Sequence, residues 1–569
     1  MIRLPFLPTS VVLPLASNST ITSPGLGLWP HPSSLSTGSE YVKLANDFNI
    51  VFAGKGYVPE DLEDAMRNTR ALIWNDQFER LLVGRGSVDA EALLNSSIST
   101  LNVLELRLTP GSNNLKSIYE NTVGVDASER DESYRLEVPS DASTAILTAN
   151  STLGLFRGLT TFTQLLYLSG ETVYTFKAPI VVNDRPAFPH RGILLDTSRN
   201  FFTTDDILLT IDAMSWSKLN VLHWHVVDSQ SFPLQVPAFP ELAEKGAYDS
   251  ASIYRVEDVK KIVEYAGSRG VDVMVEIDTP GHTTAIAESH PEHVACANAV
   301  PWVKYAHEPP AGQLRITSKE TIKFTAELFS SVMEMFPSKY FSSGGDEVNF
   351  NCYAHDAQAQ AELKLSKKTL EKALSSYVEQ THSVITGAGK TPVVWEELVL
   401  RHKINLANDT VTLVWKSSSH ARRVAKKGFR IIHVPSDYFY LDCGGGNWDG
   451  ADPKGTSWCD PYKTWHKMYS FDPYQGLKSH QRNLVLGGQV ALWTEQTDSN
   501  TLDSKLWPRA AAAAEVFWTG PVGPDDQPRR AAEAFPRLQD FRYRLVQRGV
   551  QPIALQPHWC AIRPHACDL

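Results

Sequence analysis

The sequence lacks any long hydrophobic run and any cluster of basic residues. A membrane-spanning helix needs about 18 or more consecutive apolar residues, and no such stretch occurs among the 569 residues of the chain. Nucleic acids and anionic membranes are bound by clustered positive charge, whereas this chain has a formal net charge of −10 and scattered Lys and Arg. The composition therefore predicts a globular protein with no nucleic-acid partner and no membrane partner.

A chain of this length is too long for one ordinary core, so we expect two domains. Residues 1–28 are predicted to be a signal peptide and leader. Arg3 supplies a positive charge, and an apolar stretch from Leu4 to Ala16 follows it and ends in small residues. Three prolines, at Pro5, Pro8 and Pro14, weaken this pattern. Secretion to the extracellular space is the predicted localisation.

Cysteine is scarce but even in number. Proximity in the sequence predicts three disulfides: Cys560 with Cys567, Cys443 with Cys459, and the remaining Cys296 with Cys352. Six cysteines allow about fifteen connectivities, and six reduced thiols in a cytosolic protein are the alternative. Four Asn-x-Ser/Thr sequences, at Asn18, Asn95, Asn150 and Asn408, are predicted glycosylation sites and are consistent with secretion.

The hydrophobic pattern changes near residue 188. Residues 29–188 mix short strands such as 101–108 with helical stretches such as 158–168, which predicts a smaller N-terminal α/β domain ending at a turn-rich segment, 183–186. Residues 189–569 then repeat strand, loop and helix. Eight near-continuous apolar strands are predicted, at 192–196, 221–228, 272–278, 339–343, 391–396, 411–416, 430–434 and 485–493. Amphipathic helices are predicted between several of them, at 205–218, 256–268, 319–335 and 368–385. This alternation indicates a parallel (β/α)8 barrel, followed by a C-terminal disulfide segment.

Polar and aromatic residues gather where the predicted barrel strands end, which is the place where barrel enzymes build their active sites. In chain order they are Arg199, Asp228, Asp278, His282, Asp346, Glu347, Trp395, Trp415, Tyr440, Asp442, Trp493 and Glu495. Aromatic faces stack on the C–H surfaces of sugars, and carboxylates and arginine bind hydroxyls. The pattern therefore predicts a sugar pocket at the barrel mouth.

The adjacent carboxylates Asp346 and Glu347 leave a predicted strand through the double glycine Gly344-Gly345. Like charges a few Å apart raise the pKa of one member of the pair. That member can hold a proton near neutral pH and give it to a leaving group, while its neighbour stays ionised and stabilises positive charge. Cleavage of a glycosidic bond needs this division of labour.

Four segments carry a resemblance to a known family: His190 to Arg199 (HRGILLDTSR), Asn220 to Asp228 (NVLHWHVVD), Ile277 to His282 (IDTPGH) and Gly344 to Val348 (GGDEV). Together they resemble the family-20 glycoside hydrolases, the β-N-acetylhexosaminidases. The terminal cysteine pair is most similar to that of secreted fungal members, and the resemblance runs from about Trp29 to the C-terminus.

The resemblance implies hydrolysis, with retention, of terminal N-acetylglucosamine and N-acetylgalactosamine, chitin oligomers included. The substrate's own 2-acetamido oxygen would attack the anomeric carbon, with Glu347 as general acid and then base and Asp346 orienting and stabilising the acetamido group. Other roles carried over by position are those of Trp395, Trp415 and Trp493 as walls of the acetamide pocket, Tyr440 as a donor to the acetamide oxygen, Arg199, Asp442 and Glu495 as hydroxyl ligands, and Asp228, Asp278 and His282 as the network that sets the pKa of the acid.

The resemblance also implies a homodimer that uses no cofactor and no metal. Trp465 resembles a further sugar platform, although aromatic residues are more often part of the core, and core support is the alternative interpretation. One departure concerns the leader: secreted fungal members usually carry a long propeptide, yet only a short segment separates Ala16 from Trp29.

Two rival functions remain. His223 and His225 are spaced two apart on a predicted strand and point the same way, as the ligands of a barrel metal hydrolase do. Against a metal, Asp228 lies five residues from His223 and points to the opposite face. The second rival is a non-catalytic sugar-binding protein, which would have no need for both Asp346 and Glu347.

Overall fold

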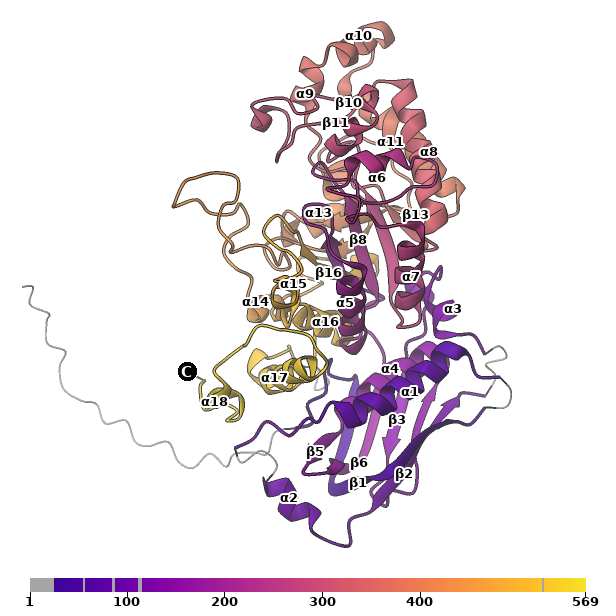
Figure 1. The fold of residues 1–569 in the computed structure, drawn as a ribbon, viewed down its shortest axis with the longest axis vertical. Helices are drawn as coiled ribbons and strands as arrows, with labels where there is room; N and C mark the ends of the chain where they lie inside the picture. Colours follow the sequence, from indigo (N-terminus) through magenta and orange to yellow (C-terminus); the bar gives the residue numbers. More distant parts are fainter. Residues whose placement is uncertain (1–24, 55–56, 84–86, 111–114, 524–526, 569) are drawn as a thin grey trace, which may run out of the picture.

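The protein consists of an N-terminal sheet with helices on one face and a large barrel stacked on those helices (Figure 1). The computed structural model describes residues 25–54, 57–83, 87–110, 115–523 and 527–568. The predicted leader, residues 1–28, and the glycosylation site Asn18 therefore lie largely or wholly outside the described residues.

The N-terminal sheet has six strands in the order β1-β2-β4-β3-β6-β5, and β1 also pairs with β6. The strands are β1 (Ser34–Phe52), β2 (Thr100–Leu108), β3 (Tyr134–Val138), β4 (Ala145–Ala149), β5 (Tyr167–Ser169) and β6 (Thr172–Asp184). Two helices, α1 (Glu60–Asn75) and α4 (Thr152–Gln164), separate the sheet from the barrel, and α2 (Ser87–Leu93) and α3 (Ile118–Thr122) are short. The predicted strand at 101–108 is confirmed as β2.

The helix predicted at 158–168 has different bounds, since α4 begins at Thr152 and ends at Gln164. Ser151 caps its first turn by accepting a hydrogen bond from the backbone N–H of Gly154. The prediction missed the first turns, which contain Gly154, a poor helix former, and it began at a second glycine, Gly158. Their place is set by packing, because a side chain at Gly154 or Gly158 would collide with Ser133 or Leu147 of the sheet layer.

The eight predicted barrel strands are all present and form a closed parallel barrel, which confirms the (β/α)8 fold. They are β7 (His190–Asp196), β8 (Val221–Val227), β9 (Asp272–Ile277), β12 (Tyr340–Ser342), β13 (Thr391–Trp395), β14 (Val411–Val414), β15 (Arg430–His433) and β16 (Val485–Leu492). The last strand, β16, pairs with the first, β7, and closes the ring. The strands are buried on both faces, which explains their continuous apolar sequences.

Helices cover the outside of the barrel. The four predicted ones are confirmed as α5 (Thr204–Trp216), α7 (Val256–Gly267), α8 (Lys319–Met335) and α11 (Leu370–Gly387). The remaining α-helices are α6 (Glu241–Gly246), α9 (Phe350–His355), α10 (Ala357–Ser366), α12 (Glu396–Leu400), α13 (Ala421–Lys426), α14 (Trp465–Tyr469), α15 (Leu502–Leu506), α16 (Arg509–Thr519), α17 (Ala531–Gln547) and α18 (His558–Ala561). A small two-stranded sheet, β10 (Val294–Ala295) with β11 (Gln313–Leu314), lies in the long connection after β9.

Buried ion pairs join the N-terminal sheet layer to the bottom of the barrel. Glu132 binds Arg157 of α4 at 2.8 Å and Arg191 of β7 at 2.6 Å, and all three side chains are fully buried. The Lys218 ammonium binds the Asp184 carboxylate at 2.9 Å across the same boundary. Charges buried in this way must be paired, so the two layers are fixed to each other.

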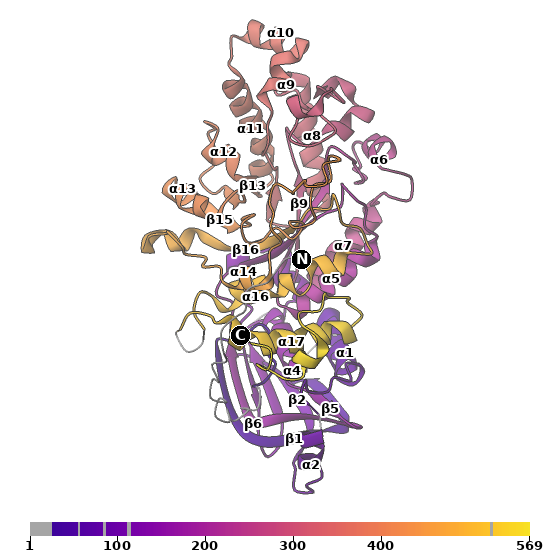
Figure 2. The ribbon, with the colours of Figure 1, turned by 90° about the vertical axis from the view of Figure 1, so that its left-hand side faces the viewer.

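The long helix α17, the second-last helix of the described chain, lies between the barrel and the N-terminal sheet layer (Figure 2). Arg544 of α17 donates to the backbone oxygens of Thr163, Gln164 and Leu166 at and beyond the end of α4. These bonds satisfy carbonyl groups that the end of a helix leaves without partners. The other end of the chain is held nearby, since the Trp29 indole donates to the backbone oxygen of Ala511 in α16 at 2.9 Å.

All three predicted disulfides are confirmed: Cys296–Cys352, Cys443–Cys459 and Cys560–Cys567. The six cysteines of the sequence are therefore all paired. Two of the bridges close loops at the C-terminal mouth of the barrel, and the third closes the end of the chain.

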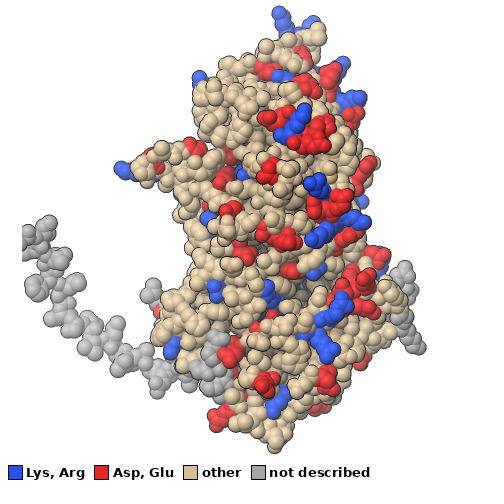
Figure 3. Space-filling model, in the orientation of Figure 1, with Lys and Arg blue, Asp and Glu red and all other residues tan. Residues whose placement is uncertain are grey.

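The surface carries interspersed charges on the face seen in Figure 3, where acidic and basic side chains alternate over both the barrel and the N-terminal layer. Within the described ranges, none of the helices is long and apolar enough to cross a membrane.

Candidate functional site

A pocket opens at the C-terminal mouth of the barrel, and most of the predicted site residues line it. Those that do are Arg199, His282, Asp346, Glu347, Trp415, Tyr440, Asp442, Trp493 and Glu495. They come from six different strand ends, which only closure of the barrel brings together.

Asp346 and Glu347 reach the pocket through a turn that only glycine can make. After β12 the chain passes Gly344 and Gly345 with φ angles of 66° and 96°, in the left-handed region. A side chain at either glycine would collide with Asp278 or Leu398. The Asp278 carboxylate accepts the backbone N–H of Gly345 at 2.8 Å and so fixes the turn.

His282 is the hub of the carboxylate cluster. Its Nδ1 lies 3.1 Å from Asp228, and its Nε2 lies 3.4 Å from Glu347 and 3.8 Å from Asp346. Asp228 in turn binds Nε2 of His225 at 2.8 Å. A continuous chain of polar contacts thus leads from the barrel interior to Glu347.

Glu276 starts this chain inside the barrel. Its carboxylate binds Nδ1 of His225 at 2.7 Å and Nε2 of His223 at 3.1 Å. Burial acts to lower the pKa of His225, but its hydrogen bonds to Asp228 and Glu276 outweigh burial and raise that pKa to about 9. Burial likewise opposes protonation of His282, but the charge of Asp228 dominates and raises the pKa of His282 well above its ordinary value. Both imidazoles are therefore cationic near neutral pH.

The site also contains side chains of the types that bind metals. Among the described residues, four groups have ligand-type atoms within 4.8 Å of one another: His225 with Glu276 and Asp278, Asp228 with His282 and Glu308, Asp278 with His282 and Asp346, and Asp442 with Cys443 and Cys459. Histidine must be neutral to bind a metal. In three of the groups, carboxylates around the histidine raise its pKa, and in the fourth the two cysteines are joined in a disulfide.

The pKa values of the two candidate catalytic carboxyls are shifted in opposite directions. Burial, reinforced by the neighbouring Glu397 and Glu347 carboxylates, raises the pKa of Asp346 to about 7, although the His282 cation opposes it. Burial also acts to raise the pKa of Glu347, but the hydrogen bond and charge of His282 outweigh it and lower that pKa. A general acid carries the higher pKa of such a pair when it acts, whereas here the higher pKa belongs to Asp346. The reason is His282, which the resemblance had placed in the network that sets the pKa of the acid and whose Nε2 lies 3.4 Å from Glu347.

Aromatic side chains form one wall of the pocket. The Trp415 and Tyr440 rings are nearly parallel, with an interplanar angle of 8° and centroids 6.1 Å apart. Trp493 closes the wall 6.3 Å from Tyr440. Trp395 lies behind this layer, with its centroid 6.3 Å from that of Trp415 and 6.1 Å from that of Trp493, and it is fully buried. The Trp415 indole donates to Glu397 at 2.9 Å, which fixes the tilt of the ring.

Arg199 also lines the pocket and is surrounded by carboxylates. Its guanidinium binds Asp228 at 2.9 Å, Asp196 at 3.4 Å, and Glu308. It also lies over the Trp493 ring, 5.1 Å from the centroid. Burial and nearby acids such as Glu308 raise the pKa of Glu495 well above its ordinary value, against the pull of Arg199.

The sequence did not reveal seven residues that line the pocket: Glu308, Trp448, Ser457, Trp458, Gln496, Thr497 and Lys505. Glu308 lies in an irregular loop, where no periodicity marks a position. The two tryptophans belong to the glycine-rich loop 443–459, and the Trp458 ring meets Trp415 edge-on at 5.6 Å. The signal that was available is the cysteine pair, because the Cys443–Cys459 bridge returns Trp458 to the pocket.

Trp465 does not line this pocket. It begins α14, is 5% exposed, and stacks on Phe535 of α17 with an interplanar angle of 14° and centroids 5.3 Å apart. This placement supports the alternative interpretation of Trp465 as core. His223, the candidate metal ligand of the rival function, is buried inside the barrel and bound to Glu276.

Comparison with known proteins identifies the family. The glycosyl hydrolase family 20 catalytic domain matches residues 188–521, and a domain described as beta-acetyl hexosaminidase like matches residues 28–165. The chain belongs to glycosyl hydrolase family 20. It is therefore a glycoside hydrolase, a β-N-acetylhexosaminidase that hydrolyses terminal N-acetylhexosamine.

Relatives in family 20 align over most of the chain. A beta-hexosaminidase of Arthroderma benhamiae is 34% identical over 543 residues, which cover 90% of this chain and 86% of that one. A chitooligosaccharidolytic beta-N-acetylglucosaminidase of Bombyx mori is 36% identical over 453 residues, which cover 76% and 74%. The predicted resemblance to β-N-acetylhexosaminidases, fungal ones included, is confirmed.

Solved structures share the family 20 fold. The chitobiase of Flavobacterium johnsoniae superposes with a TM-score of 0.72 at 24% identity, covering 92% of this chain and 73% of that one. The β-N-acetylhexosaminidase of Streptomyces coelicolor superposes with a TM-score of 0.70 at 22% identity, covering 94% and 99%. At these identities the likeness supports the barrel with its N-terminal domain.

Proposed function

We propose that this β-N-acetylhexosaminidase releases both N-acetylglucosamine and N-acetylgalactosamine from non-reducing ends, with retention, through the substrate's own 2-acetamido group. In this mechanism the acetamido oxygen attacks the anomeric carbon while Glu347 protonates the leaving oxygen. Glu347 then acts as base toward water. Asp346 orients the acetamido group and pairs with the positive charge that develops on it.

The single observation that carries this mechanism is the shared side of Asp346 and Glu347. The two residues are consecutive, and their carboxyls lie 3.8 Å and 3.4 Å from the same nitrogen of His282. A conventional retaining enzyme places its acid and its nucleophile on opposite faces of the sugar, about 5 to 5.5 Å apart. Two carboxylates that approach from one side leave the far face without an enzymic nucleophile, and the acetamido oxygen supplies one.

The remaining pocket residues fit the sugar. Trp415 and Trp493 would contact the acetamide methyl group with Trp395 packed behind them, and the Tyr440 hydroxyl would donate to the acetamide oxygen. Arg199, Asp442 and Glu495 would bind the hydroxyls. Burial raises the pKa of Asp442 to about 7, so below that pH the Asp442 carboxyl can donate as well as accept hydrogen bonds.

Chitin oligomers are the substrates that the pocket rim favours. Trp458 is 66% exposed and Trp448 is 42% exposed, yet both line the pocket. An exposed ring at the mouth of a sugar pocket offers a stacking surface for the next sugar of a chain. The relative from Bombyx mori is named for action on chitooligosaccharides, which agrees with this assignment.

We further propose that the protein is secreted, extracellular and homodimeric. Secretion is supported by three disulfides, since such bridges persist in oxidising compartments. The glycosylation sites Asn95, Asn150 and Asn408 are exposed and so are open to modification. The homodimer rests on the family resemblance alone.

The proposal is tested by release of p-nitrophenol from four glycosides. We expect activity on the N-acetylglucosaminide and the N-acetylgalactosaminide and none on the plain glucoside, which has no 2-acetamido group. Fluorine on the acetyl group makes the acetamido oxygen less basic, so the trifluoroacetyl glucosaminide should react about 10² or more times slower if that oxygen is the nucleophile.

The opposite result has a distinct signature. An enzymic nucleophile would leave the rate nearly indifferent to fluorination of the acetyl group. A 2-fluoro glycoside would then leave a covalent sugar adduct on Asp346, which mass spectrometry of the peptides would detect. Hydrolysis of the plain glucoside at a comparable rate would also contradict the proposal.

A further inference from the structure

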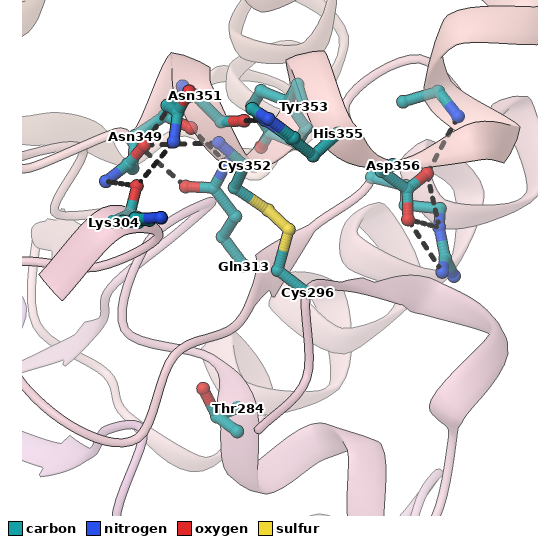
Figure 4. The surroundings of a disulfide bond; sticks show 12 residues. Thr284, Cys296, Lys304, Gln313, Asn349, Asn351, Cys352, Tyr353, His355 and Asp356 are labelled. Carbon is teal, nitrogen blue, oxygen red and sulfur yellow. Dashed lines mark hydrogen bonds and ion pairs between the residues drawn. A yellow bond between two sulfur atoms is a disulfide. The ribbon is translucent and has the colours of Figure 1, made fainter. Parts of the chain in front are cut away.

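A buried glutamine ties the segment after Glu347 to the neighbouring loop (Figure 4). Gln313 belongs to β11, and its side chain is buried. Its side-chain oxygen accepts the backbone N–H of Asn349 at 3.0 Å, and its side-chain nitrogen donates to the backbone oxygen of Asn349 at 2.8 Å. One amide thus uses both of its functional groups on one backbone residue, two positions after Glu347.

Glu347 needs external support because its backbone is strained. Its φ angle of 52° lies in the left-handed region, which residues other than glycine rarely adopt. Such a conformation persists only where the surroundings hold it on both sides. Before Glu347, Asp278 holds the N–H of Gly345. After Glu347, the amide of Gln313 holds both polar groups of Asn349.

The loop that carries Gln313 is itself firmly anchored. Gln313 pairs with Ala295 in the β10–β11 sheet, and the next residue, Leu314, donates its N–H to Pro280 at 2.8 Å. The Cys296–Cys352 disulfide joins the same loop to α9, the helix that follows Asn349. Figure 4 shows this bridge beside the Gln313–Asn349 pair.

A third contact joins the loop to α9 at the protein surface. Asn351 donates its side-chain amide to the backbone oxygen of Lys304 at 2.8 Å. A small cavity lies at the junction, and its lining includes Glu347, His282, Gln313 and Asn349. Any displacement of Asn349 is therefore transmitted within two residues to the Glu347 carboxyl and its contact with His282.

We propose that Gln313 is a positioning residue for the general acid: it holds the backbone at Asn349 so that the Glu347 carboxyl meets the leaving oxygen. This inference rests on the acid role assigned to Glu347 under the proposed function. Gln313 does not contact the sugar pocket and would act only through the segment that it holds. Misplacement of a catalytic group by about 1 Å costs roughly 10²-fold in rate, which sets the scale of the expected effect.

The test replaces Gln313 by methionine, which has a similar length and removes both hydrogen bonds. For chitobiose, whose leaving sugar must be protonated, kcat/KM should fall by about 10 to 100-fold. For the 2,4-dinitrophenyl glycoside, whose leaving group needs no proton, it should fall by less than about threefold. Equal losses on both substrates, or no loss on either, would overturn the proposal.

Gln164 is a matched control. Its side-chain amide makes the same two-way pair with the backbone of Trp29, at 2.7 and 2.8 Å, and it is equally buried, but it lies between the N-terminal layer and the barrel. Gln164→Met should leave the ratio of the two kcat/KM values unchanged. The same split in this variant would show that any lost buried amide produces it, and the proposal would fail.

A milder variant keeps the test decisive if Gln313→Met does not fold. Asn351→Ala removes the exposed contact with Lys304 and should shift the ratio in the same direction by a smaller amount; an unchanged ratio would then overturn the inference. Glu347→Gln is measured in parallel. If it shows no dependence on the leaving group, the acid assignment fails. If Glu347→Gln depends on the leaving group and the variants Gln313→Met and Asn351→Ala do not, only the role of Gln313 fails.

Discussion

Asp346 and Glu347 lie so close to the same histidine that their titration belongs to the pair. Catalysis needs one proton and one negative charge on the two carboxyls. Burial is the main cause that raises the pKa of Asp346 to about 7. At Glu347 the effect of His282 is larger than that of burial, and the pKa of Glu347 is lowered. Between these two values the pair holds one proton. A positive charge developing on the acetamido group beside Asp346 would favour moving that proton to Glu347.

The pair predicts an acidic working range. A raised pKa at Asp346 means that its proton is kept up to about pH 7 and lost above it. We therefore expect kcat/KM to be high on the acidic side of pH 7 and to fall about tenfold per pH unit above it. In the variant Asp346→Asn, Glu347 is the only carboxyl of the pair that titrates. Because its pKa is lowered, the fall of kcat/KM should begin at a lower pH than in the parent enzyme.

The measurement is a pH profile of kcat/KM with the p-nitrophenyl N-acetylglucosaminide, on the parent enzyme and on Asp346→Asn. The free enzyme's pKa values govern this parameter. A basic limb that stays in the same place in the variant would show that a group other than the carboxylate pair sets it.

The sequence predicted residues that stand at regular strand ends and missed those held by irregular loops. Arg199, Tyr440 and Trp493 could be found because each follows a strand whose apolar run is visible. Glu308 and Gln313 lie in the connection after β9, where neither spacing nor composition marks them. Their positions depend on contacts with distant segments, such as that of Gln313 with Asn349.

At the scale of elements, α14 shows how a tryptophan near the pocket can belong to the core. Trp465 stacks on Phe535, so α14 and α17 are joined by their aromatic faces. We expect Trp465→Ala to lower the free energy of unfolding by about 3 to 5 kcal/mol, as for other large buried aromatic residues. The KM for the p-nitrophenyl N-acetylglucosaminide should stay within about twofold of the parent value.

Urea denaturation and steady-state kinetics measure these two quantities. Trp415→Ala is the comparison, since the Trp415 ring lines the pocket and its loss should raise KM. A rise in KM for Trp465→Ala as large as that for Trp415→Ala would contradict the core role and would show that Trp465 contributes to sugar binding.

The barrel strands were easier to predict than helix α4 for a physical reason. A barrel strand buried on both faces is apolar throughout, so the ends of its apolar run in the sequence indicate where the strand begins and ends. The bounds of α4 depend instead on glycines that lie against Ser133 and Leu147. Local propensity disfavours a helix there, and tertiary packing overrides it.

At the scale of the whole molecule, the buried charges around Glu132 join the N-terminal layer to the barrel. Burial acts to raise the pKa of Glu132, but Arg191 and Arg157 outweigh it and lower that pKa to about 2, below its ordinary value of 4.5. Because the folded-state pKa is the lower one, this carboxylate stabilises the fold fully above about pH 4.5. The contribution is lost as pH falls from 4.5 toward 2.

Glu132→Gln should therefore lower the free energy of unfolding at pH 7 by about 3 to 5 kcal/mol, because two buried arginines lose their counter-charge. The difference from the parent should shrink below pH 4.5. Urea denaturation at several pH values measures it, with Glu105→Gln as the control, because Glu105 pairs with Arg107 at the surface. A loss no larger than that of the control would contradict the role given to the buried network.

The closure of the barrel has a consequence for how the protein is made. The first barrel strand, β7, pairs with the last, β16, so that Gly192 lies beside Gln489. During synthesis the ribosome delivers β7 long before its second neighbour exists. The nascent barrel must therefore keep an open, apolar edge until nearly the whole chain has emerged. The buried contact of Trp29 with α16 forms later still, because α16 is synthesised after β16. The segment around Trp29 therefore lacks this packing partner during most of the synthesis. Truncation before α16 should leave an aggregating fragment rather than a smaller enzyme.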